Sequence, residues 1–212
     1  MATDDNKRKI VETALQMFNS RGLRGVTMDD IAAAMRMSKR TLYETFSTKE
    51  ELLAECLMQV HDAIENRHKQ IYKRVDEPVL VALYMLRVNA MQNQNYHHLI
   101  EESKRYYPEI YDRFFKLHTT SLRTMVTQAL DYAETNHYLR PNVDKETTAD
   151  FLCKSIQAHR LTEIDNREEY SRKVGEIGFT FLRGLMSTDA IARYEKREEE
   201  FRKLLEDLKL EE

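Results

Sequence analysis

Glycine and proline are scarce in this chain, with five glycines and three prolines among 212 residues. Folds built from strands need frequent turns, and turns favour these two residues, so their scarcity indicates long helices joined by few connections. Apolar residues also recur at helical spacing, as in Ile10, Ala14 and Phe18 near the N-terminus. We therefore predict an all-α protein with about nine or ten helices.

Hydroxyl side chains mark the predicted starts of three helices near the N-terminus. Thr27 has Asp30 three residues further on, which is the spacing of a capping box. Ser38 starts the next helix, and Thr48 starts a longer one. Because a helix over about residues 6–20 precedes them, the sequence predicts three short helices followed by a long fourth helix.

The second and third helices have the spacing of a helix-turn-helix, in which two helices are joined by a turn of a few residues. Their apolar residues Ile31, Met35, Leu42 and Phe46 would pack against the first helix. The opposite face of the third helix then remains free for a partner.

On a helical wheel with Leu42 toward the core, Arg40 and Glu44 point outward, and Thr41 and Tyr43 flank them. This face fits a DNA major groove, because Arg bonds guanine, Thr contacts the thymine methyl group and Tyr reaches phosphates. Helix starts also attract phosphate through their free N–H groups and the helix dipole. The alternative is an ordinary solvated face on a small three-helix bundle.

The formal net charge is −3, which does not suggest a strongly basic nucleic-acid binder. The charge is uneven, however: residues 1–50 hold nine Lys and Arg against seven Asp and Glu, whereas the rest holds 24 against 29. A mildly basic N-terminal segment on an acidic body is compatible with DNA binding. The asymmetry is small, so the prediction depends on residue positions rather than on charge.

From Gly22 to Leu53 the sequence reads GLRGVTMDDIAAAMRMSKRTLYETFSTKEELL, which resembles the DNA-binding segment of the TetR family of transcriptional regulators. The resemblance implies an all-helical homodimer. It also implies a helix-turn-helix DNA-binding domain over residues 1–50 and a ligand-binding and dimerisation domain over residues 51–212, joined by the long fourth helix.

The resemblance assigns roles to individual residues of the helix-turn-helix. It implies phosphate contacts for Thr27, Tyr43 and Lys49, and contacts in or near the bases for residues 39–41 and 45. The complete set of candidate DNA-binding residues is Thr27, Ser38, Lys39, Arg40, Thr41, Tyr43, Glu44, Thr45 and Lys49.

Two residues depart from the family's usual pattern. Arg36 occupies a turn position where the family often has glycine, and a left-handed backbone there would cost a non-glycine residue ~1 kcal/mol. Glu44 lies on the groove-facing side, where a carboxylate repels phosphate. It would either accept from cytosine N4 or pair with Arg40 one turn away and hold it in position, and we favour the pair.

The rest of the chain predicts six further helices, over about residues 79–92, 96–106, 109–135, 145–159, 168–186 and 189–208. The helix over 109–135 has His118, Ser121 and Gln128 on its apolar stripe, and polar groups in an apolar cavity are typical of small-molecule pockets. Most such stripes are plain core. The candidate ligand-binding residues are Tyr84, Met91, Tyr107, Phe114, His118, Ser121, Met125, Phe151 and His159.

By resemblance, the helices over 145–159 and 168–186 form the dimer interface as a four-helix bundle with their mates. The candidate interface residues are Phe151, Ile156, Ile177, Gly178, Phe181, Leu182 and Leu185. The last, highly charged helix would pack against the body, extend the dimer contact or remain a frayed, solvated helix.

Several classes of protein are not indicated. His97 and His98 point about 100° apart on a helix and have no carboxylate or cysteine at a metal-binding spacing, so we expect no metal and no cofactor. Cys56 and Cys153 are far apart among apolar neighbours, which favours inert thiols in a reduced cytoplasmic setting. No apolar run approaches the ~20 residues that span a bilayer, so we expect no membrane partner.

We interpret the chain as a ligand-responsive repressor rather than an enzyme. Its expected partners are a double-stranded, pseudo-palindromic DNA operator, a second copy of the chain, and an unidentified small-molecule effector whose binding releases the DNA. The alternatives are a helical protein-interaction adaptor and an uncharacterised helical enzyme. The sequence has no nucleophile–base pair and no phosphate-binding loop at a spacing known from enzymes, which argues against the enzyme.

Overall fold

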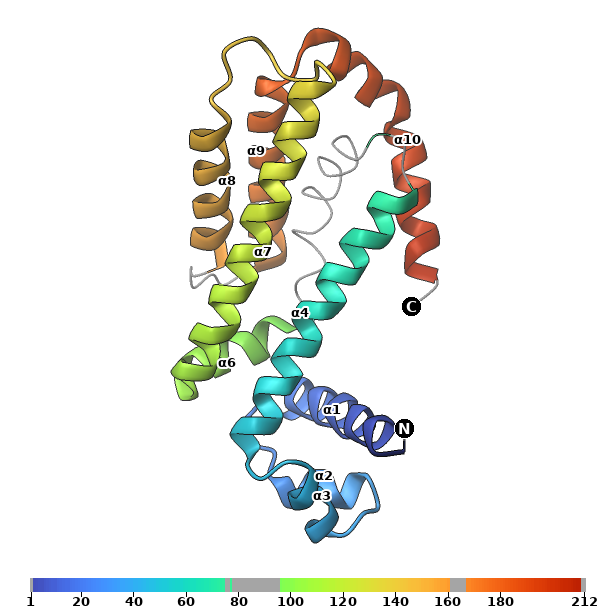
Figure 1. Cartoon of the computed structure of the whole chain (residues 1–212), viewed down its shortest axis with the longest axis vertical. Coiled ribbons are helices and arrows are strands. Elements are labelled where there is room, and N and C mark those ends of the chain that lie inside the picture. The colour runs from blue at the N-terminus through green and yellow to red at the C-terminus, as the bar shows by residue number, and fades with distance from the viewer. Residues whose placement is uncertain (1, 75–76, 78–95, 161–166, 211–212) are drawn as a thin grey trace. The chain divides into compact units, whose positions relative to one another are not determined.

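The computed structural model describes residues 2–74, 77, 96–160 and 167–210, and these residues form an all-α fold (Figure 1). Its described helices are α1 (Ala2–Arg21), α2 (Met28–Ala34), α3 (Lys39–Thr45), α4 (Lys49–Arg74), α6 (His97–Tyr106), α7 (Pro108–Thr135), α8 (Lys145–Arg160), α9 (Arg167–Leu185) and α10 (Thr188–Leu210). The prediction of an all-helical protein with a helix-turn-helix near its N-terminus is confirmed. The helix expected over residues 79–92, with the candidate ligand residues Tyr84 and Met91, lies outside the described residues.

The predicted hydroxyl caps are present at the starts of α2 and α3. The Thr27 side chain accepts from the backbone N–H of Asp30, and the Asp30 carboxylate accepts in return from the backbone N–H of Thr27. Ser38 accepts from the N–H of Thr41 at 3.1 Å. Each cap satisfies donors that the first turn of a helix leaves without intrahelical partners, which explains why helices begin at these residues.

The turn between α2 and α3 has the left-handed residue that its sequence suggested. Arg36 has φ 53°, and its N–H and that of Met37 donate to the carbonyls of Ala33 and Ala32 at 3.1 and 3.0 Å. This pair of bonds is a Schellman motif, in which the residue after the helix end takes a left-handed conformation. Arg36 is exposed, so its side chain gains little packing in return for that conformation.

The chain divides into two compact units. The first consists of residues 1–68 and 93–118, and the second of residues 69–92 and 119–212. The first unit therefore contains the helix-turn-helix together with the start of α4, α6 and the start of α7. The functional division at residue 50 stays a prediction, and the compact unit around the helix-turn-helix is larger than that division.

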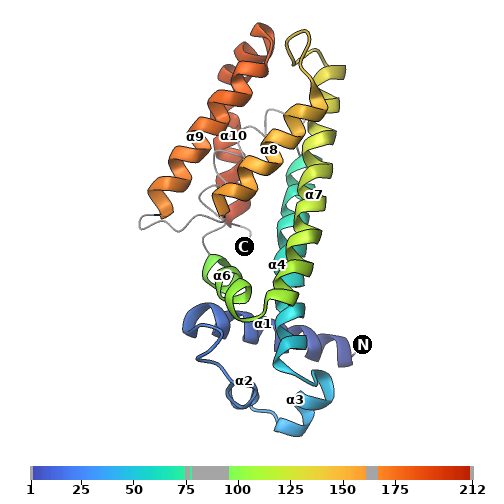
Figure 2. The same cartoon turned by 90° about the vertical axis from the view of Figure 1, so that its left-hand side faces the viewer.

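The core of the first unit joins α1, α2 and α3 to α4, α6 and α7. Its central side chains are fully or almost fully buried and include Phe18 of α1, Ile31 of α2, Leu42 of α3 and Leu53 of α4. Leu99 of α6 belongs to the same cluster, and Figure 2 shows α6 beside α1. Burial of this apolar surface is what fixes α3 in place, since a helix of seven residues is not stable alone.

The second unit has its own core between α7, α8 and α9. It is formed by buried residues such as Leu130 and Leu152, with Phe181 packed against them. Up to Phe201 the last helix is not a frayed, solvated segment, because Tyr194 and Phe201 of α10 are 3% and 2% exposed. Of the alternatives for this helix, packing against the body is supported as far as Phe201.

Both cysteines are buried, as predicted. Burial raises the pKa of the Cys56 thiol to about 12, and its Sγ donates to the carbonyl of Val11 at 3.7 Å. Burial also raises the pKa of Cys153. Burial therefore disfavours the thiolate form of both cysteines, which is the form that redox chemistry needs.

None of the helices that the structure describes combines the length and the apolar character needed to cross a bilayer. Within the same residues, no three His, Cys, Asp or Glu side chains are grouped as metal ligands would be.

Candidate nucleic-acid interface

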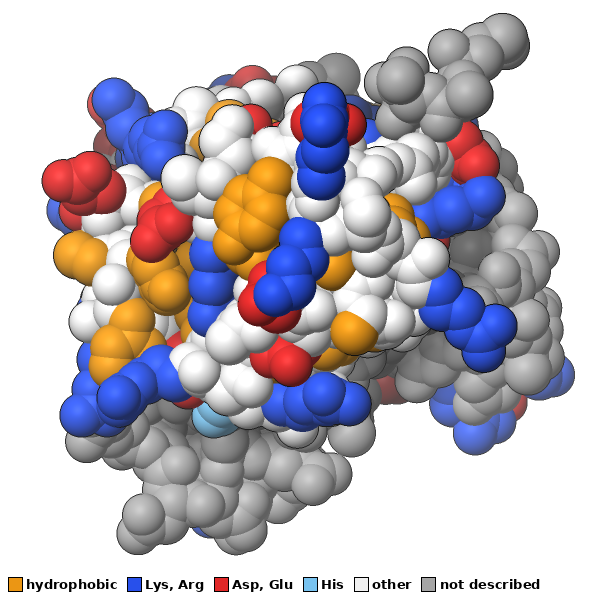
Figure 3. Space-filling model, turned by 90° about the horizontal axis from the view of Figure 1, so that it is seen from below, with side chains coloured by type: hydrophobic (Ala, Val, Ile, Leu, Met, Phe, Trp, Pro, Cys, Tyr) orange, Lys and Arg blue, Asp and Glu red, His pale blue; other side chains and the backbone are white. Residues whose placement is uncertain are grey.

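The third helix presents one face to the core and the opposite face to solvent. Leu42 and Phe46 are 0% and 1% exposed, whereas residues 38–41 and Tyr43 are exposed. Figure 3 views the end of the molecule at which α2 and α3 lie, where Lys and Arg side chains alternate with Asp and Glu around exposed hydrophobic groups. The predicted division of α3 into a buried and a free face is therefore confirmed.

Each of the two cations at the start of α3 is paired with a carboxylate. The Nε atom of Arg40 donates to Glu44 Oε1 at 2.9 Å, which confirms the pairing that we favoured. The Nζ atom of Lys39 donates to Asp29 Oδ2 of α2 at 2.5 Å, and this pair raises the pKa of Lys39. Sequence reasoning missed Asp29, because it precedes Lys39 by ten residues on a different helix.

The hydroxyl groups of α3 are largely used within the helix. The Ser38 and Thr41 hydroxyl oxygens lie 2.8 Å apart, and the Thr45 hydroxyl donates to the carbonyl of Thr41 at 3.1 Å. Ser38 and Thr41 remain exposed, whereas Thr45 is half-buried. Ser38 and Thr41 are therefore better placed for a base or phosphate than Thr45.

Thr27 and Tyr43 stand on the exposed surface of the same unit. The Thr27 hydroxyl donates to Asp30 Oδ2 at 2.6 Å, and this bond, with the one from the Thr27 backbone, lowers the pKa of the Asp30 carboxyl group. Tyr43 is 46% exposed, which is unusual for a large aromatic side chain and leaves its ring free for a partner. Both residues are accessible in the way that a phosphate contact requires.

Lys49 is placed differently from the other candidates. Its Nζ atom donates to the backbone carbonyls of Leu23 and Val26, the second at 2.6 Å, and stands 5.6 Å from the centre of the Phe18 ring. The side chain is half-buried, and burial lowers the pKa of its ammonium group. The phosphate contact implied for Lys49 stays a prediction, while the geometry gives this cation a contact inside the first unit.

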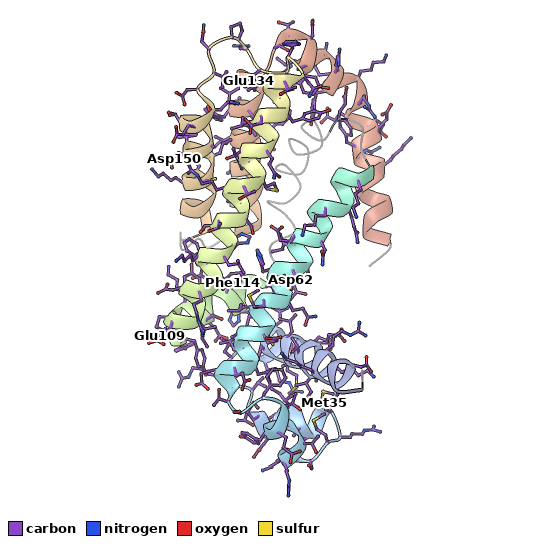
Figure 4. All side chains as sticks on the ribbon, viewed as in Figure 1. Met35, Asp62, Glu109, Phe114, Glu134 and Asp150 are labelled. Carbon is purple, nitrogen blue, oxygen red and sulfur yellow. The ribbon has the colours of Figure 1, made fainter. Side chains whose placement is uncertain are left out.

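The candidate ligand-binding residues are distributed over both compact units. Phe114 and His118 of α7 belong to the first unit and stack with ring centres 5.8 Å apart. Phe114 is labelled in Figure 4. His118 also meets His61 of α4 edge to face at 6.0 Å. His61, which our candidate set omitted, is 5% exposed, and its Nδ1 atom has no hydrogen-bond partner among the described residues.

The other described ligand candidates differ in their burial and in the unit to which they belong. Tyr107 is half-buried in the first unit, and Ser121 and Met125 are half-buried in the second. Phe151 is 52% exposed on α8. His159 lies within α8, but its side chain is outside the described ones.

Two of the candidate dimer residues, Phe151 of α8 and Ile177 of α9, are exposed apolar side chains in the second unit. Ile177 is 69% exposed, and Phe151 packs on Phe181 with ring centres 4.9 Å apart. A Cβ atom added at Gly178 would meet nothing within 4 Å. Leu182 and Leu185 are half-buried, and the side chain of Ile156 is outside the described ones.

Comparison with known proteins agrees with this geometry. Residues 10–56 match the sequence model of the tetR family of bacterial regulatory proteins. The HTH-type transcriptional repressor KstR2 of Mycobacterium tuberculosis is 26% identical over 153 residues, which cover 70% of this chain and 76% of that protein. The negative transcriptional regulator IcaR of Staphylococcus aureus is 32% identical over 60 residues, 28% of this chain and 32% of that protein.

Solved structures agree on the fold. A TetR transcription regulator from Haloarcula marismortui superposes with a TM-score of 0.73 at 18% identity, over 87% of this chain and all of that one. The segment matched by the family model contains α2, α3 and the caps described above. Residues 10–56 therefore match the TetR family of bacterial regulatory proteins, and the predicted resemblance of the chain to that family is confirmed.

Proposed function

We propose that this protein is a cytoplasmic, ligand-responsive repressor that binds a pseudo-palindromic operator as a homodimer. The observation that carries the proposal is the free face of α3, with Arg40, Thr41 and Tyr43 exposed opposite the buried Leu42. Two similar proteins, KstR2 and IcaR, are named as a repressor and a negative regulator, which supports repression as the direction of control.

The residues of the free face have separate roles in this proposal. Arg40 reads guanine in the major groove, and Glu44 holds its guanidinium group in the reading position. Lys39 and Thr41 contact bases at the start of the helix, with Ser38 beside them. Thr27 and Tyr43 contact phosphates on either side of the groove, which positions α3 but conveys no sequence preference.

Dimerisation is proposed through the exposed apolar face of α8 and α9. An isoleucine that is 69% exposed is costly in water, and Phe151 on α8, which is 52% exposed, is a second exposed apolar side chain. Gly178 has open space around it, so a second helix is able to approach closely. A two-fold dimer would place the two α3 helices about 34–36 Å apart, one turn of DNA.

The buried cluster of His61, Phe114 and His118 supports a small-molecule effector that has a polar group. A buried imidazole nitrogen without a partner is unfavourable, and a ligand hydroxyl or carbonyl oxygen would remove that cost. His61 is on α4, the helix that begins directly after the helix-turn-helix. An effector that binds better to one position of α4 would shift the population between DNA-binding and released states.

The operator half of the proposal is tested by selecting bound duplexes from a random pool with the full chain. Binding of the selected duplex is then measured against salt concentration. A regulator gives a pseudo-palindrome and a steep log–log salt dependence, whereas a protein-interaction adaptor or an enzyme gives no enriched sequence and a flat dependence.

The role of Arg40 is tested by Arg40→Ala, with Lys104→Ala on the exposed surface of α6 as the control. Loss of the bidentate guanine contact should relax preference at one base pair of each half-site by about tenfold. Lys104→Ala should leave preference at that position unchanged. Equal preference in the wild type and Arg40→Ala would show that another residue reads the operator.

The effector half is tested by screening small molecules for thermal stabilisation of the protein and then for release of the selected duplex. A true effector does both, and His61→Phe should remove its effect by filling the site and deleting the polar nitrogen. A compound that stabilises the protein through this site but leaves operator affinity unchanged would contradict the proposed coupling.

A further inference from the structure

The turn between α1 and α2 is held by two side chains of opposite charge from other helices. The backbone N–H of Leu23 donates to Glu102 Oε2 of α6 at 2.5 Å. The carbonyls of Leu23 and Val26 accept from the Nζ atom of Lys49 at the start of α4. We call these contacts the Leu23 clasp: Glu102, Lys49 and the backbone of Leu23 and Val26, all within the first compact unit.

The clasp lies at a site where its hydrogen bonds are difficult to replace. Leu23 and Val26 are fully buried, and the Glu102 side chain is 20% exposed. Burial lowers the pKa of Lys49, and the negative charge of Glu102 is among those that oppose this shift. If either side chain were lost, backbone groups of a buried residue would lose their partners, which costs far more than the loss of an ordinary surface contact.

Two glycines let the turn adopt the shape that the clasp binds. Gly22 has φ 76°, and a Cβ atom there would lie 3.1 Å from Glu102 Oε2. A Cβ atom at Gly25 would lie 2.5 Å from the carbonyl oxygen of Arg21, a distance that real Cβ atoms do not adopt. The conformation of the turn therefore depends on the absence of a side chain at both glycines. It depends also on the hydrogen bonds that the charged side chains of Glu102 and Lys49 make with the backbone of Leu23.

This turn sets the position of the surface that meets DNA. Thr27, the cap of α2, follows Val26 directly, and α2 leads through a short turn to α3. A second contact links the turn to α6, because the Arg24 guanidinium group stands 5.4 Å from the centre of the Tyr106 ring. The direction in which α2 leaves α1 thus depends on where α6 holds the turn.

We propose that Glu102 and Lys49 are positioning residues for DNA binding, which act through the backbone of Leu23 rather than by contact with DNA. Movement of α6 would release Leu23, reorient α2 and misplace the caps and α3 together. The clasp therefore makes α6 a second connection to the DNA-binding surface besides α4. The DNA-binding part of this inference rests on the proposed function, whereas the clasp itself is testable without DNA.

Salt dependence distinguishes a positioning lysine from a phosphate-binding one. Lys49→Met keeps the apolar stem and removes the charge, and we expect operator affinity to fall about tenfold with an unchanged log–log salt slope. Loss of a phosphate contact would instead reduce the slope by about 0.9. Lys39→Met is the control at a proposed base contact, and it should relax sequence preference. A reduced slope for Lys49→Met would overturn its positioning role.

Hydrogen exchange of the free protein tests the Glu102 half and remains decisive if Lys49→Met fails to fold. Glu102→Ala should speed amide exchange in a peptide covering residues 22–27 by about tenfold, because the Leu23 N–H loses its acceptor. Glu102→Gln keeps an acceptor oxygen and should have a smaller effect. Glu101→Ala, one residue away on another side of α6, should have none.

The outcomes separate this inference from the proposed function. Unchanged exchange over residues 22–27 in Glu102→Ala, or an equal increase throughout α1–α3, would overturn the clasp even if the protein binds its operator. Faster local exchange without any loss of operator affinity would overturn the positioning role. If the wild type binds no duplex DNA, the proposed function fails, while the exchange result still decides whether the clasp exists.

Discussion

Replacing Arg36 by glycine should stabilise the protein. Arg36 is held at φ 53° by the Schellman motif that ends α2. In this conformation the Cβ atom of an L-residue crowds the following carbonyl group, and glycine has no Cβ atom. Arg36→Gly should therefore keep both hydrogen bonds of the motif and remove the backbone strain.

The expected magnitude is the difference between two terms. A left-handed conformation costs a non-glycine residue about 1–2 kcal/mol. Glycine gives back roughly 0.5–1 kcal/mol of this, because it has more freedom in the unfolded chain. The net gain in the free energy of unfolding is then about 0.5–1 kcal/mol, which corresponds to a rise in Tm of about 1–4 °C for a chain of this size.

The gain in the free energy of unfolding is measured by urea unfolding, followed by the circular dichroism signal of the helices. The urea midpoint should rise while the m-value stays unchanged. Arg36→Ala is the matched control, since it removes the guanidinium group but keeps the strain, and it should leave the free energy of unfolding nearly unchanged. His137 offers an independent test in the second unit. It has φ 58°, and its N–H and that of Tyr138 form the same pair of bonds at the end of α7.

His137→Gly should thus stabilise by a similar amount. If neither glycine variant is more stable than its alanine counterpart, the left-handed conformation is not a source of strain in this protein, and the argument from backbone geometry fails.

Three further results are expected. Glu44→Gln should raise affinity for unrelated duplex DNA more than affinity for the operator, because it removes a carboxylate from the DNA-facing surface and frees Arg40. In competition titrations with a scrambled duplex, the ratio of operator affinity to scrambled-duplex affinity should fall by about threefold or more. Asp30→Asn should destabilise the protein at neutral pH. The folded-state pKa of Asp30 lies below its ordinary value of 3.8, so the stability contributed by its carboxylate is present above pH 3.8 and is lost as the pH falls through the folded-state pKa. The urea midpoints of variant and wild type should therefore converge in acid. Ile177→Asp should shift the protein toward monomers in sedimentation velocity while leaving the circular dichroism of the folded chain unchanged, since it puts a charge on an exposed apolar face; a dimer of wild-type affinity would exclude that face as the interface.

The features that were predictable from sequence are those determined by neighbouring residues. The caps at Thr27 and Ser38 depend on side chains three residues away, and the burial of Leu42 and Phe46 depends on the helical period. The pairing of Arg40 with a carboxylate one turn away is local in the same sense.

The features that sequence reasoning missed depend on distant packing. The contact between Glu102 and Leu23 spans 79 positions in the chain, and nothing near either residue indicates it. For the same reason sequence reasoning missed that the ammonium group of Lys49 reaches backbone carbonyls 23 and 26 positions earlier, whereas the phosphate contact implied for this residue stays a prediction. His61 was missed as a ligand candidate because the burial of its Nδ1 atom, without a hydrogen-bond partner among the described residues, follows only from the packing of α4.

Cys56 gives the DNA-binding unit a built-in reporter of its own opening. Its thiol is fully buried between α4 and α1, and it is protonated at neutral pH because burial raises its pKa to about 12. An alkylating reagent must reach the sulfur and reacts with the thiolate form. The native structure therefore protects Cys56 both by burying the sulfur and by raising its pKa. The rate at which Cys56 is alkylated therefore reports how often the packing around this sulfur opens.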